Sequence, residues 1–120
     1  MTKEIQKGTV ICQSGQPADS IHMIIKGTVR AIYQGGEYLL EKGDVIGLFD
    51  IYRENYIFTY TALDDVAIAS FPCKKGGISA LFSKKPDFAM IAAKSCFKQI
   101  LNILEVYEFN KEFWKEEASG

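Results

Sequence analysis

The sequence predicts a mainly β domain that ends in helices, and three observations lead to this fold class. At 120 residues the chain is long enough for one domain with a single buried core. Between residues 8 and 72, short β-rich runs alternate with glycine-containing turns, which is typical of an antiparallel sandwich or barrel. From Gly77 onward, apolar residues recur every three or four positions, which indicates helices. We therefore expect a β unit over residues 1–76 and a helical unit over residues 77–120, both within one domain.

The β unit is expected to contain seven short strands, which cover residues 10–13, 20–25, 28–33, 37–41, 44–49, 56–63 and 66–71. Residues typical of turns lie between them at Gly15-Gln16-Pro17, Lys26-Gly27, Gly35-Gly36 and Lys42-Gly43-Asp44. The segment Gln34-Gly35-Gly36 fits a tight hairpin, because glycine adopts positive φ angles without a steric penalty.

Two helices are expected in the second unit, a short one over residues 78–84 and a long one that begins near Pro86. Proline suits the first turn of a helix, because its missing N–H has no intrahelical partner there. One apolar stripe follows along the long helix and consists of Ala93, Phe97, Ile100, Leu104, Tyr107 and, after a break at Lys111, Trp114.

Such a stripe usually packs on the sheet of its own domain. About 30 residues of helix, however, span on the order of 45 Å, which is more than one small sheet covers. We therefore expect part of the stripe to face a second copy of the chain, in a homodimer formed through the long helix.

Composition excludes several classes of function. The formal net charge is −1 and only Arg30 and Arg53 are arginines, so no basic surface for nucleic acid or an anionic membrane is expected. The longest uncharged apolar stretch, residues 55–63, is too short to cross a bilayer, and the N-terminus has no signal-peptide pattern. These features predict a cytoplasmic protein without a membrane partner.

The supply of metal-binding and catalytic side chains is also small. Cys12, Cys73 and Cys96 are far apart without CxxC spacing, which favours free, reduced thiols. Zinc and iron–sulfur sites normally need four ligands, and His22 is the only histidine. We therefore expect no metal, no cofactor and no enzymatic activity.

Short motifs follow one another in a fixed order in three stretches of the chain. Residues 8–29 read GTVICQSGQPADSIHMIIKGTV, residues 40–47 read LEKGDVIG, and residues 62–66 read ALDDV. Together they resemble the cyclic-nucleotide-binding domain family, closest in outline to the effector domains of catabolite-activator-type (Crp/Fnr) transcription regulators. The resemblance covers residues 8 to about 110. It implies a double-stranded β-helix, also called a jelly roll or β-roll, followed by a long dimerisation helix.

The resemblance also places the ligand site in a cassette at residues 43–63. In members that bind a cyclic nucleotide, a glutamate after the cassette glycine takes the ribose hydroxyl, and an arginine farther on pairs with the cyclic phosphate. Here Gly47 matches the glycine, but Leu48 stands at the glutamate position and Tyr56 at the arginine position. In those members a small residue and then a threonine or serine follow the arginine. Here Phe58 stands at the position of the small residue, and Thr59 keeps the hydroxyl. Both charged ligands are absent, so usual cAMP or cGMP binding is expected to be lost.

The candidate pocket residues are therefore Gly47, Leu48, Phe49, Arg53, Tyr56, Phe58, Thr59 and Tyr60. Alternation places Tyr56, Phe58 and Tyr60 on one face of a strand, either as filled core or as an aromatic pocket for an apolar ligand. Leu48 and Phe58 are expected to crowd the space beside Gly47. Arg53 is expected in an exposed turn, although it could also contact a ligand from there.

The resemblance implies a non-catalytic regulatory effector or sensor domain with a possible small-molecule effector of unknown identity. Two alternatives stay open, a ligand-free dimerisation or protein-interaction module and a domain that binds a cyclic nucleotide weakly through Arg53. DNA would be contacted only through a segment that this chain does not contain, because no helix-turn-helix pattern follows Trp114.

Overall fold

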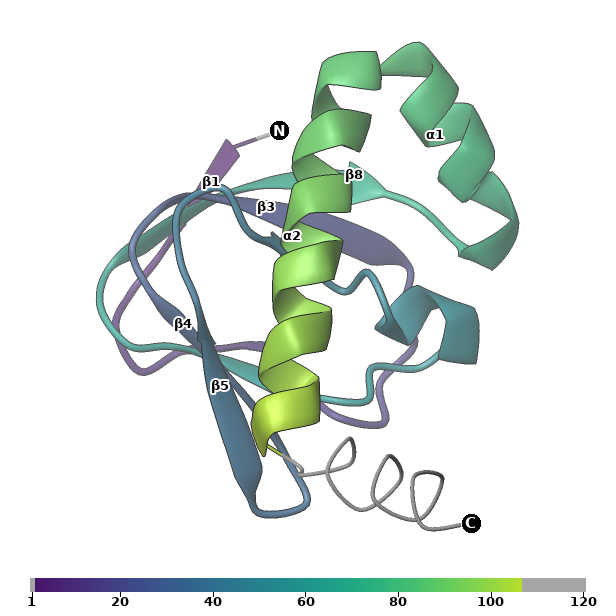
Figure 1. The fold of residues 1–120 in the computed structure, drawn as a ribbon. Coiled ribbons are helices and arrows are strands. Elements are labelled where there is room, and N and C mark those ends of the chain that lie inside the picture. Colours follow the sequence, from purple (N-terminus) through teal and green to yellow (C-terminus); the bar gives the residue numbers. More distant parts are fainter. Residues whose placement is uncertain (1, 107–120) are drawn as a thin grey trace, which may run out of the picture.

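The computed structural model describes residues 2–106, which form two antiparallel sheets rolled against each other and followed by two helices (Figure 1). The first sheet has the strand order β1-β8-β3-β6 and the second has the order β2-β7-β4-β5. The strands are β1 (Thr2–Ile5), β2 (Val10–Cys12), β3 (Ser20–Lys26), β4 (Val29–Tyr33), β5 (Gly36–Leu40), β6 (Val45–Ile46), β7 (Thr59–Ala62) and β8 (Val66–Pro72). The predicted mainly β fold with C-terminal helices is confirmed.

The β4–β5 hairpin shows how the sequence sets a turn. Tyr33 pairs with Gly36, so only two residues connect the strands. Gln34 and Gly35 both have positive φ angles, 49° and 78°. Two consecutive positive φ angles match the twist of the flanking strands, and glycine adopts such an angle without strain. The tight hairpin expected at Gln34-Gly35-Gly36 is confirmed.

Three strand predictions need correction. The chain has an additional strand, β1, which pairs with β8 at the edge of the first sheet. The strand expected at residues 44–49 is limited to Val45–Ile46, because Gly47 turns the chain with a φ of 96°. The strand expected from residue 56 begins only at Thr59. A 3₁₀ helix, η1 (Asp50–Arg53), occupies part of the segment between these two strands.

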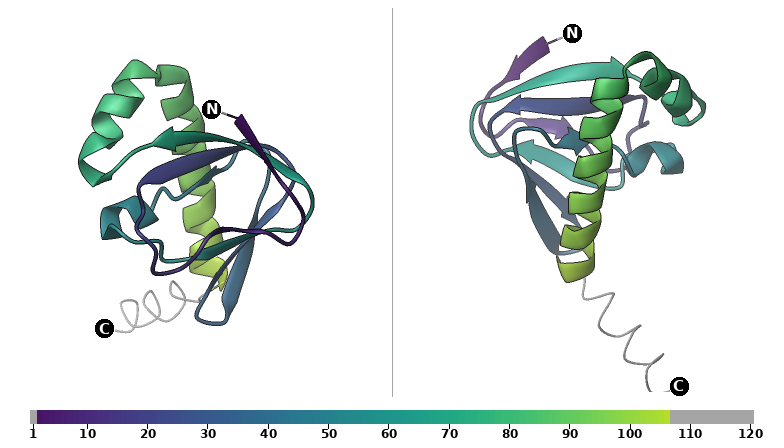
Figure 2. Two further views of the ribbon diagram at one scale, coloured as in Figure 1. Left: turned by 180° about the vertical axis from the view of Figure 1, so that it is seen from behind. Right: turned by 45° about the horizontal axis from the view of Figure 1, so that its top comes forward.

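Both helices occur where the sequence predicts them. Helix α1 covers Ile78–Lys84, and α2 covers Pro86–Val106 with the proline in its first turn. Helix α2 lies across the roll and contacts β5 and β6, as the further views in Figure 2 also show. Its first turns are fixed by Phe88, whose ring stacks on Phe71 of β8 at 4.3 Å and meets Phe82 of α1 edge-on.

The face that α2 presents to the roll differs from the predicted one. Its buried residues are Phe88, Ala92, Ser95 and Gln99. The expected stripe lies on the opposite side, with Ala93 exposed, Phe97 66% exposed, Ile100 41% exposed and Leu104 partly buried. The usual packing of such a stripe on the sheet of its own domain does not hold for Ala93, Phe97 and Ile100, and the expected contact of this stripe with a second copy stays a prediction. Tyr107 and Trp114, which extend the expected stripe, lie outside the described residues.

Candidate functional site

The candidate ligand cassette, residues 43–63, includes β6, η1 and β7, and backbone hydrogen bonds fix the segment before β7 to the turn after β2. The Tyr56 N–H donates to the Gln16 carbonyl and the Gly15 N–H donates to the Tyr56 carbonyl, both at 2.8 Å. In the same turn, the Ala18 N–H donates to the Glu54 carbonyl at 3.0 Å. The position at which an arginine was expected therefore has a defined place in the roll, and Tyr56 occupies it.

The space beside Gly47 is filled by the Tyr56 ring. A Cβ atom added to Gly47 would lie 3.4 Å from Tyr56 Cε1 and 3.2 Å from the Ser20 carbonyl oxygen. The Tyr56 hydroxyl donates to that same Ser20 carbonyl at 2.7 Å, which satisfies its polar end within the roll. Ile21 Cγ2 also lies 3.5 Å from this position, and the expectation that Leu48 and Phe58 crowd the space stays a prediction.

Phe58 and Tyr60 of the cassette belong to a cluster of aromatic rings. Phe58 lies edge-on against Tyr33 at 5.8 Å and Tyr38 at 5.5 Å, and its ring centroid is 6.0 Å from that of Tyr60. Tyr56, Phe58 and Tyr60 are all buried, whereas the residues between them are partly buried. The predicted alternation is confirmed, and these three rings fill the core of the roll.

A buried carboxylate lies behind these rings. Asp50, at the start of η1, is fully buried. Its Oδ1 accepts hydrogen bonds from the N–H groups of Ile57 at 2.6 Å and Phe58 at 3.4 Å. Its Oδ2 accepts one from the Tyr60 hydroxyl at 2.6 Å. These contacts explain why residues 57 and 58 do not continue β7, since Asp50 binds backbone donors there that a strand would use.

Burial alters the acid–base behaviour of this cluster. Burial raises the pKa of the Asp50 carboxyl, although its three donors act in the opposite direction. Burial and the neighbouring Asp50 charge raise the pKa of Tyr60 well above its ordinary value. Burial also raises the pKa of the Cys12 thiol to about 11, despite its hydrogen bond with Tyr56. Burial thus favours the neutral form of Asp50, whereas the bonds from Tyr60, Ile57 and Phe58 favour the carboxylate.

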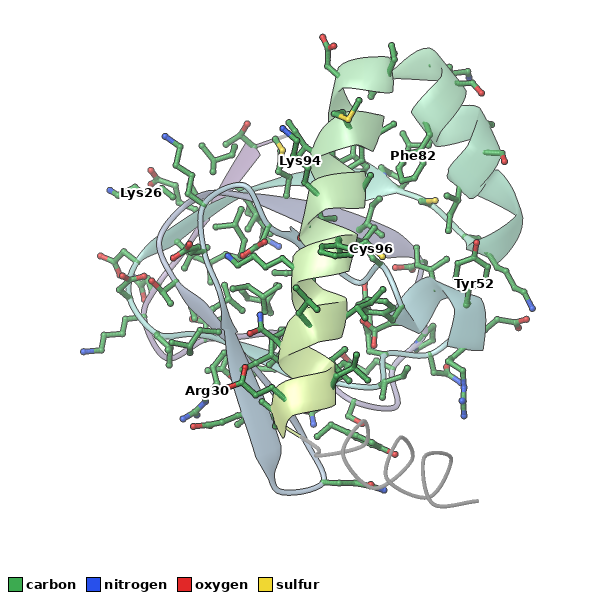
Figure 3. All side chains as sticks on the ribbon, in the orientation of Figure 1. Lys26, Arg30, Tyr52, Phe82, Lys94 and Cys96 are labelled. Atoms are coloured by element: carbon green, nitrogen blue, oxygen red, sulfur yellow. The ribbon has the colours of Figure 1, made fainter. Side chains whose placement is uncertain are left out.

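The remaining candidates do not converge on one ligand position. Arg53 is exposed in η1, as expected, beside Tyr52, which is 63% exposed on the outer side of the same helix (Figure 3). Thr59 Oγ1 accepts a hydrogen bond from the Ser14 N–H at 3.2 Å, so its hydroxyl holds the β2 turn. Leu48 and Phe49 are partly buried.

An open pocket of about 540 Å³ does bring several candidates near the end of α2. It lies between the β4–β5 hairpin, the cassette and the helix, and its lining residues are uncharged: Tyr33, Gln34, Phe49, Ile57, Phe58, Ile103 and Leu104. Phe49, Phe58 and Leu104 of the predicted sets meet here, whereas Arg53 and Tyr56 do not line it. The pocket offers apolar contacts and no cation.

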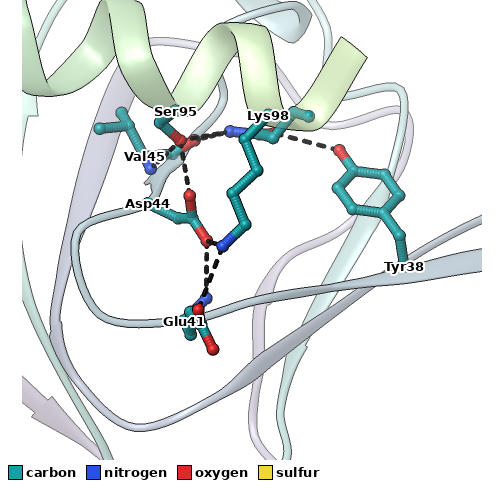
Figure 4. A network of polar contacts seen from close by, with 7 residues as sticks. Tyr38, Glu41, Asp44, Val45, Ser95 and Lys98 are labelled. Carbon is teal, nitrogen blue, oxygen red and sulfur yellow. Dashed lines mark hydrogen bonds and ion pairs between the residues drawn. The ribbon is translucent and has the colours of Figure 1, made fainter. Parts of the chain in front are cut away.

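A polar network that sequence reasoning missed joins α2 to the turn at the start of the cassette (Figure 4). Ser95 Oγ donates to Asp44 Oδ1 at 3.0 Å and accepts from the Val45 N–H at 2.9 Å. Gln99 Nε2 donates to the Val45 carbonyl at 2.8 Å, and Gln99 Oε1 accepts from the Tyr38 hydroxyl at 3.1 Å. Asp44, Ser95 and Gln99 are buried, so these bonds satisfy polar groups that water does not reach.

A lysine closes this network at the surface. Lys98 Nζ lies 3.0 Å from Asp44 Oδ2 and 3.2 Å from Glu41 Oε1. Partial burial acts against its charge, but the bonds to Asp44 and Glu41 are stronger and raise the pKa of Lys98. In the sequence, Ser95, Lys98 and Gln99 stand among other polar and charged residues of the same helix, such as Lys94 and Asn102, so no pattern distinguishes them.

Among the described residues, no group of histidine, cysteine, aspartate or glutamate side chains has the geometry of a metal site. Within residues 2–106, no helix has both the length and the apolar character that crossing a membrane requires. The three cysteines are free, with Cys12 and Cys73 buried and Cys96 partly buried.

Comparison with known proteins agrees with the motifs. A family model described as "Cyclic nucleotide-binding domain" matches residues 2–75. A search of curated protein sequences finds no match.

Several solved structures share the fold at low sequence identity. The c-di-GMP-responsive global regulator CLP of Xanthomonas campestris superposes with a TM-score of 0.72 at 16% identity, over 90% of this chain and 56% of the regulator. A transcriptional regulator of the CRP/FNR family from Thermus thermophilus gives 0.64 at 20% identity, over 90% and 54%. The regulatory subunit of a cAMP-independent protein kinase A from Trypanosoma brucei gives 0.58 at 16% identity, over 72% and 35%. The chain thus spans about a third to about half of the length of these proteins.

Proposed function

The chain belongs to the cyclic nucleotide-binding domain family, and we propose that it is a regulatory domain of the Crp/Fnr type that does not bind cAMP or cGMP in the usual way. The domain acts without catalysis, as a sensor or scaffold that passes its state to a partner through α2. In a longer protein, a DNA-binding segment would be that partner.

The observation that carries this proposal is the position of Tyr56. Its ring lies against Gly47, and its hydroxyl is satisfied by the Ser20 carbonyl. An arginine at this position would offer a fixed cation for the phosphate, whereas tyrosine offers neither charge nor free space. Leu48, at the glutamate position, cannot accept a hydrogen bond from a ribose.

The energetic cost of these replacements is substantial. A hydrogen bond to a charged group contributes about 1.5–3 kcal/mol, and here two such contacts are missing. Since about 1.4 kcal/mol corresponds to a factor of ten in affinity, the loss weakens binding by about two to four orders of magnitude. Arg53 does not compensate, because it is exposed, and the atoms nearest to the Cβ position of Gly47 belong to Ser20, Tyr56 and Ile21.

We further propose that the chain forms a homodimer through the exposed stripe of α2, defined here as Met90, Ala93, Phe97, Ile100, Leu101 and Leu104. Met90, Phe97, Ile100 and Leu101 are between 41% and 66% exposed. These positions recur every three or four residues, so their side chains share one face of the helix. A continuous apolar face of this kind is stabilised when a second helix covers it.

Thermal unfolding with added nucleotide tests the proposed loss of binding. A ligand at 100 times its dissociation constant stabilises a folded protein by about 2.7 kcal/mol, which is readily measured. We expect no change in the melting temperature with cAMP or cGMP at roughly 100 µM. This concentration is 100 times the dissociation constant of a ligand that binds with an affinity of about 1 µM. A clear, saturable shift with either nucleotide would falsify the proposal and would favour binding through Arg53.

A further inference from the structure

The Asp50 carboxylate is placed as a bound anion would be. It lies inside the cassette, fully buried, and both of its oxygens accept hydrogen bonds. Two of the three donors are the consecutive N–H groups of Ile57 and Phe58. These residues directly follow Tyr56, the position at which the resemblance expects the phosphate-binding arginine. The third donor is the hydroxyl of Tyr60 in β7, the strand that begins directly after Phe58.

From this geometry we propose that Asp50 is a built-in anion, which occupies an anion cradle formed by the Ile57 and Phe58 N–H groups and the Tyr60 hydroxyl. The cassette is then occupied by its own chain and holds its folded arrangement without a ligand. This inference rests on the proposed function, because it explains how a domain with the cassette fold persists without a nucleotide.

The surroundings of the cradle support this interpretation. Three donors converge on one carboxylate in a place without water contact, and each would lose its partner if the carboxylate were absent. No basic side chain takes part in these bonds, so the carboxylate is held by neutral donors alone, as backbone amides hold anions elsewhere in proteins. The other ionisable groups that face Asp50 are Cys12 of β2 and Tyr56, both of which burial keeps neutral.

Chemical rescue with formate tests the proposal. The variant Asp50→Ala removes a carboxylate group and leaves a space of the size of one formate ion. We expect its melting temperature to fall by roughly 10 °C or more, because three donors lose their acceptor. Formate should then raise it in a saturable manner by about 3 °C or more, relative to sodium chloride of equal concentration.

Three control proteins accompany this variant, and none of them should respond to formate. In the wild type, the Asp50 carboxylate already occupies the anion cradle. Asp50→Asn fills the same space without charge and should be less stable than the wild type. Asp64→Ala removes a carboxylate that accepts the Thr28 N–H at 2.8 Å at an exposed turn, where water replaces it.

The inference is overturned if formate does not stabilise Asp50→Ala more than Asp64→Ala, or if Asp50→Asn is as stable as the wild type. If Asp50→Ala does not fold in chloride, its folded fraction by circular dichroism over the same formate series becomes the readout, and no recovery contradicts the proposal. A nucleotide-induced shift of the wild type would overturn the proposed function, whereas an absent formate effect overturns only the role of Asp50.

Discussion

Replacing Phe97 with aspartate is expected to dissociate the proposed dimer into monomers. Phe97 is the most exposed large apolar residue of the stripe, at 66%. In a symmetric dimer the substitution introduces two charges into the interface, and burying an unpaired charge there costs several kcal/mol. We expect the dissociation constant of the dimer to rise by at least about 100-fold, which corresponds to about 2.7 kcal/mol. Sedimentation velocity over a range of protein concentrations measures this change.

Two alanines provide a matched pair for this experiment. Ala93 lies on the exposed stripe of α2, whereas Ala80 lies in α1, and both are exposed. Ala93→Asp should weaken the dimer, and Ala80→Asp should leave its mass unchanged, although both add the same charge to a helix surface. A dimer that tolerates both Phe97→Asp and Ala93→Asp would remove α2 from the interface.

Replacing Gln99 with leucine is expected to lower the free energy of unfolding by about 2–4 kcal/mol, although the new side chain has a similar size. Gln99 is 1% exposed and binds the Val45 carbonyl, Ser95 Oγ and the Tyr38 hydroxyl. Leucine removes these bonds and leaves the Val45 carbonyl without its side-chain donor in a buried place. Urea denaturation followed by circular dichroism measures the difference.

The matched control for Gln99 is Asn102→Leu on the same helix. Asn102 is partly exposed, so water can replace any contact that its amide makes, and the expected change is within about 0.5 kcal/mol. If Gln99→Leu is also within about 0.5 kcal/mol of the wild type, the polar network does not fix α2 to the roll. Because Asp44 and Val45 lie at the start of the cassette, this network connects the cassette with the proposed dimer helix.

The elements whose signals are local could be predicted from the sequence. Pro86 gives the start of α2, and glycines at turns allow the positive φ angles found at Gly15, Gly27, Gly35 and Gly43. The edge strand β1 was missed because its sequence, Thr2–Ile5, places only one buried residue toward the core. A strand with a single buried side chain shows no alternation for a sequence pattern to detect.

The orientation of α2 could not be predicted, because its buried face is partly polar. Ser95 and Gln99 look like surface residues in the sequence, and the apolar stripe around Phe97 looks like the core face. In the structure, Ser95 and Gln99 are buried against the roll. The backbone of Val45 and the side chains of Asp44 and Tyr38 form hydrogen bonds with these two polar side chains. Such partners are distant in the chain and appear only when the fold brings them together.

The cassette, too, could be predicted only in part from the sequence. The absence of its charged ligands was evident from Leu48 and Tyr56 in the sequence. The role of Asp50 was not, because a single acidic residue within Gly47–Ile51 resembles an ordinary turn residue. Only the folded chain shows that its carboxylate turns inward to the backbone donors at residues 57 and 58.

Amide resonances in the wild-type cassette give the most direct test of whether this roll is closed to a cyclic phosphate. Two-dimensional ¹H–¹⁵N spectra recorded during a titration with cAMP would follow the N–H groups of Gly47, Ile57 and Phe58. We expect these resonances to stay in place at roughly 10 µM nucleotide, which would saturate a site of micromolar affinity, because Tyr56 and Asp50 already occupy the space and the donors. Saturable movement of the Ile57 and Phe58 resonances at micromolar cAMP would contradict the account.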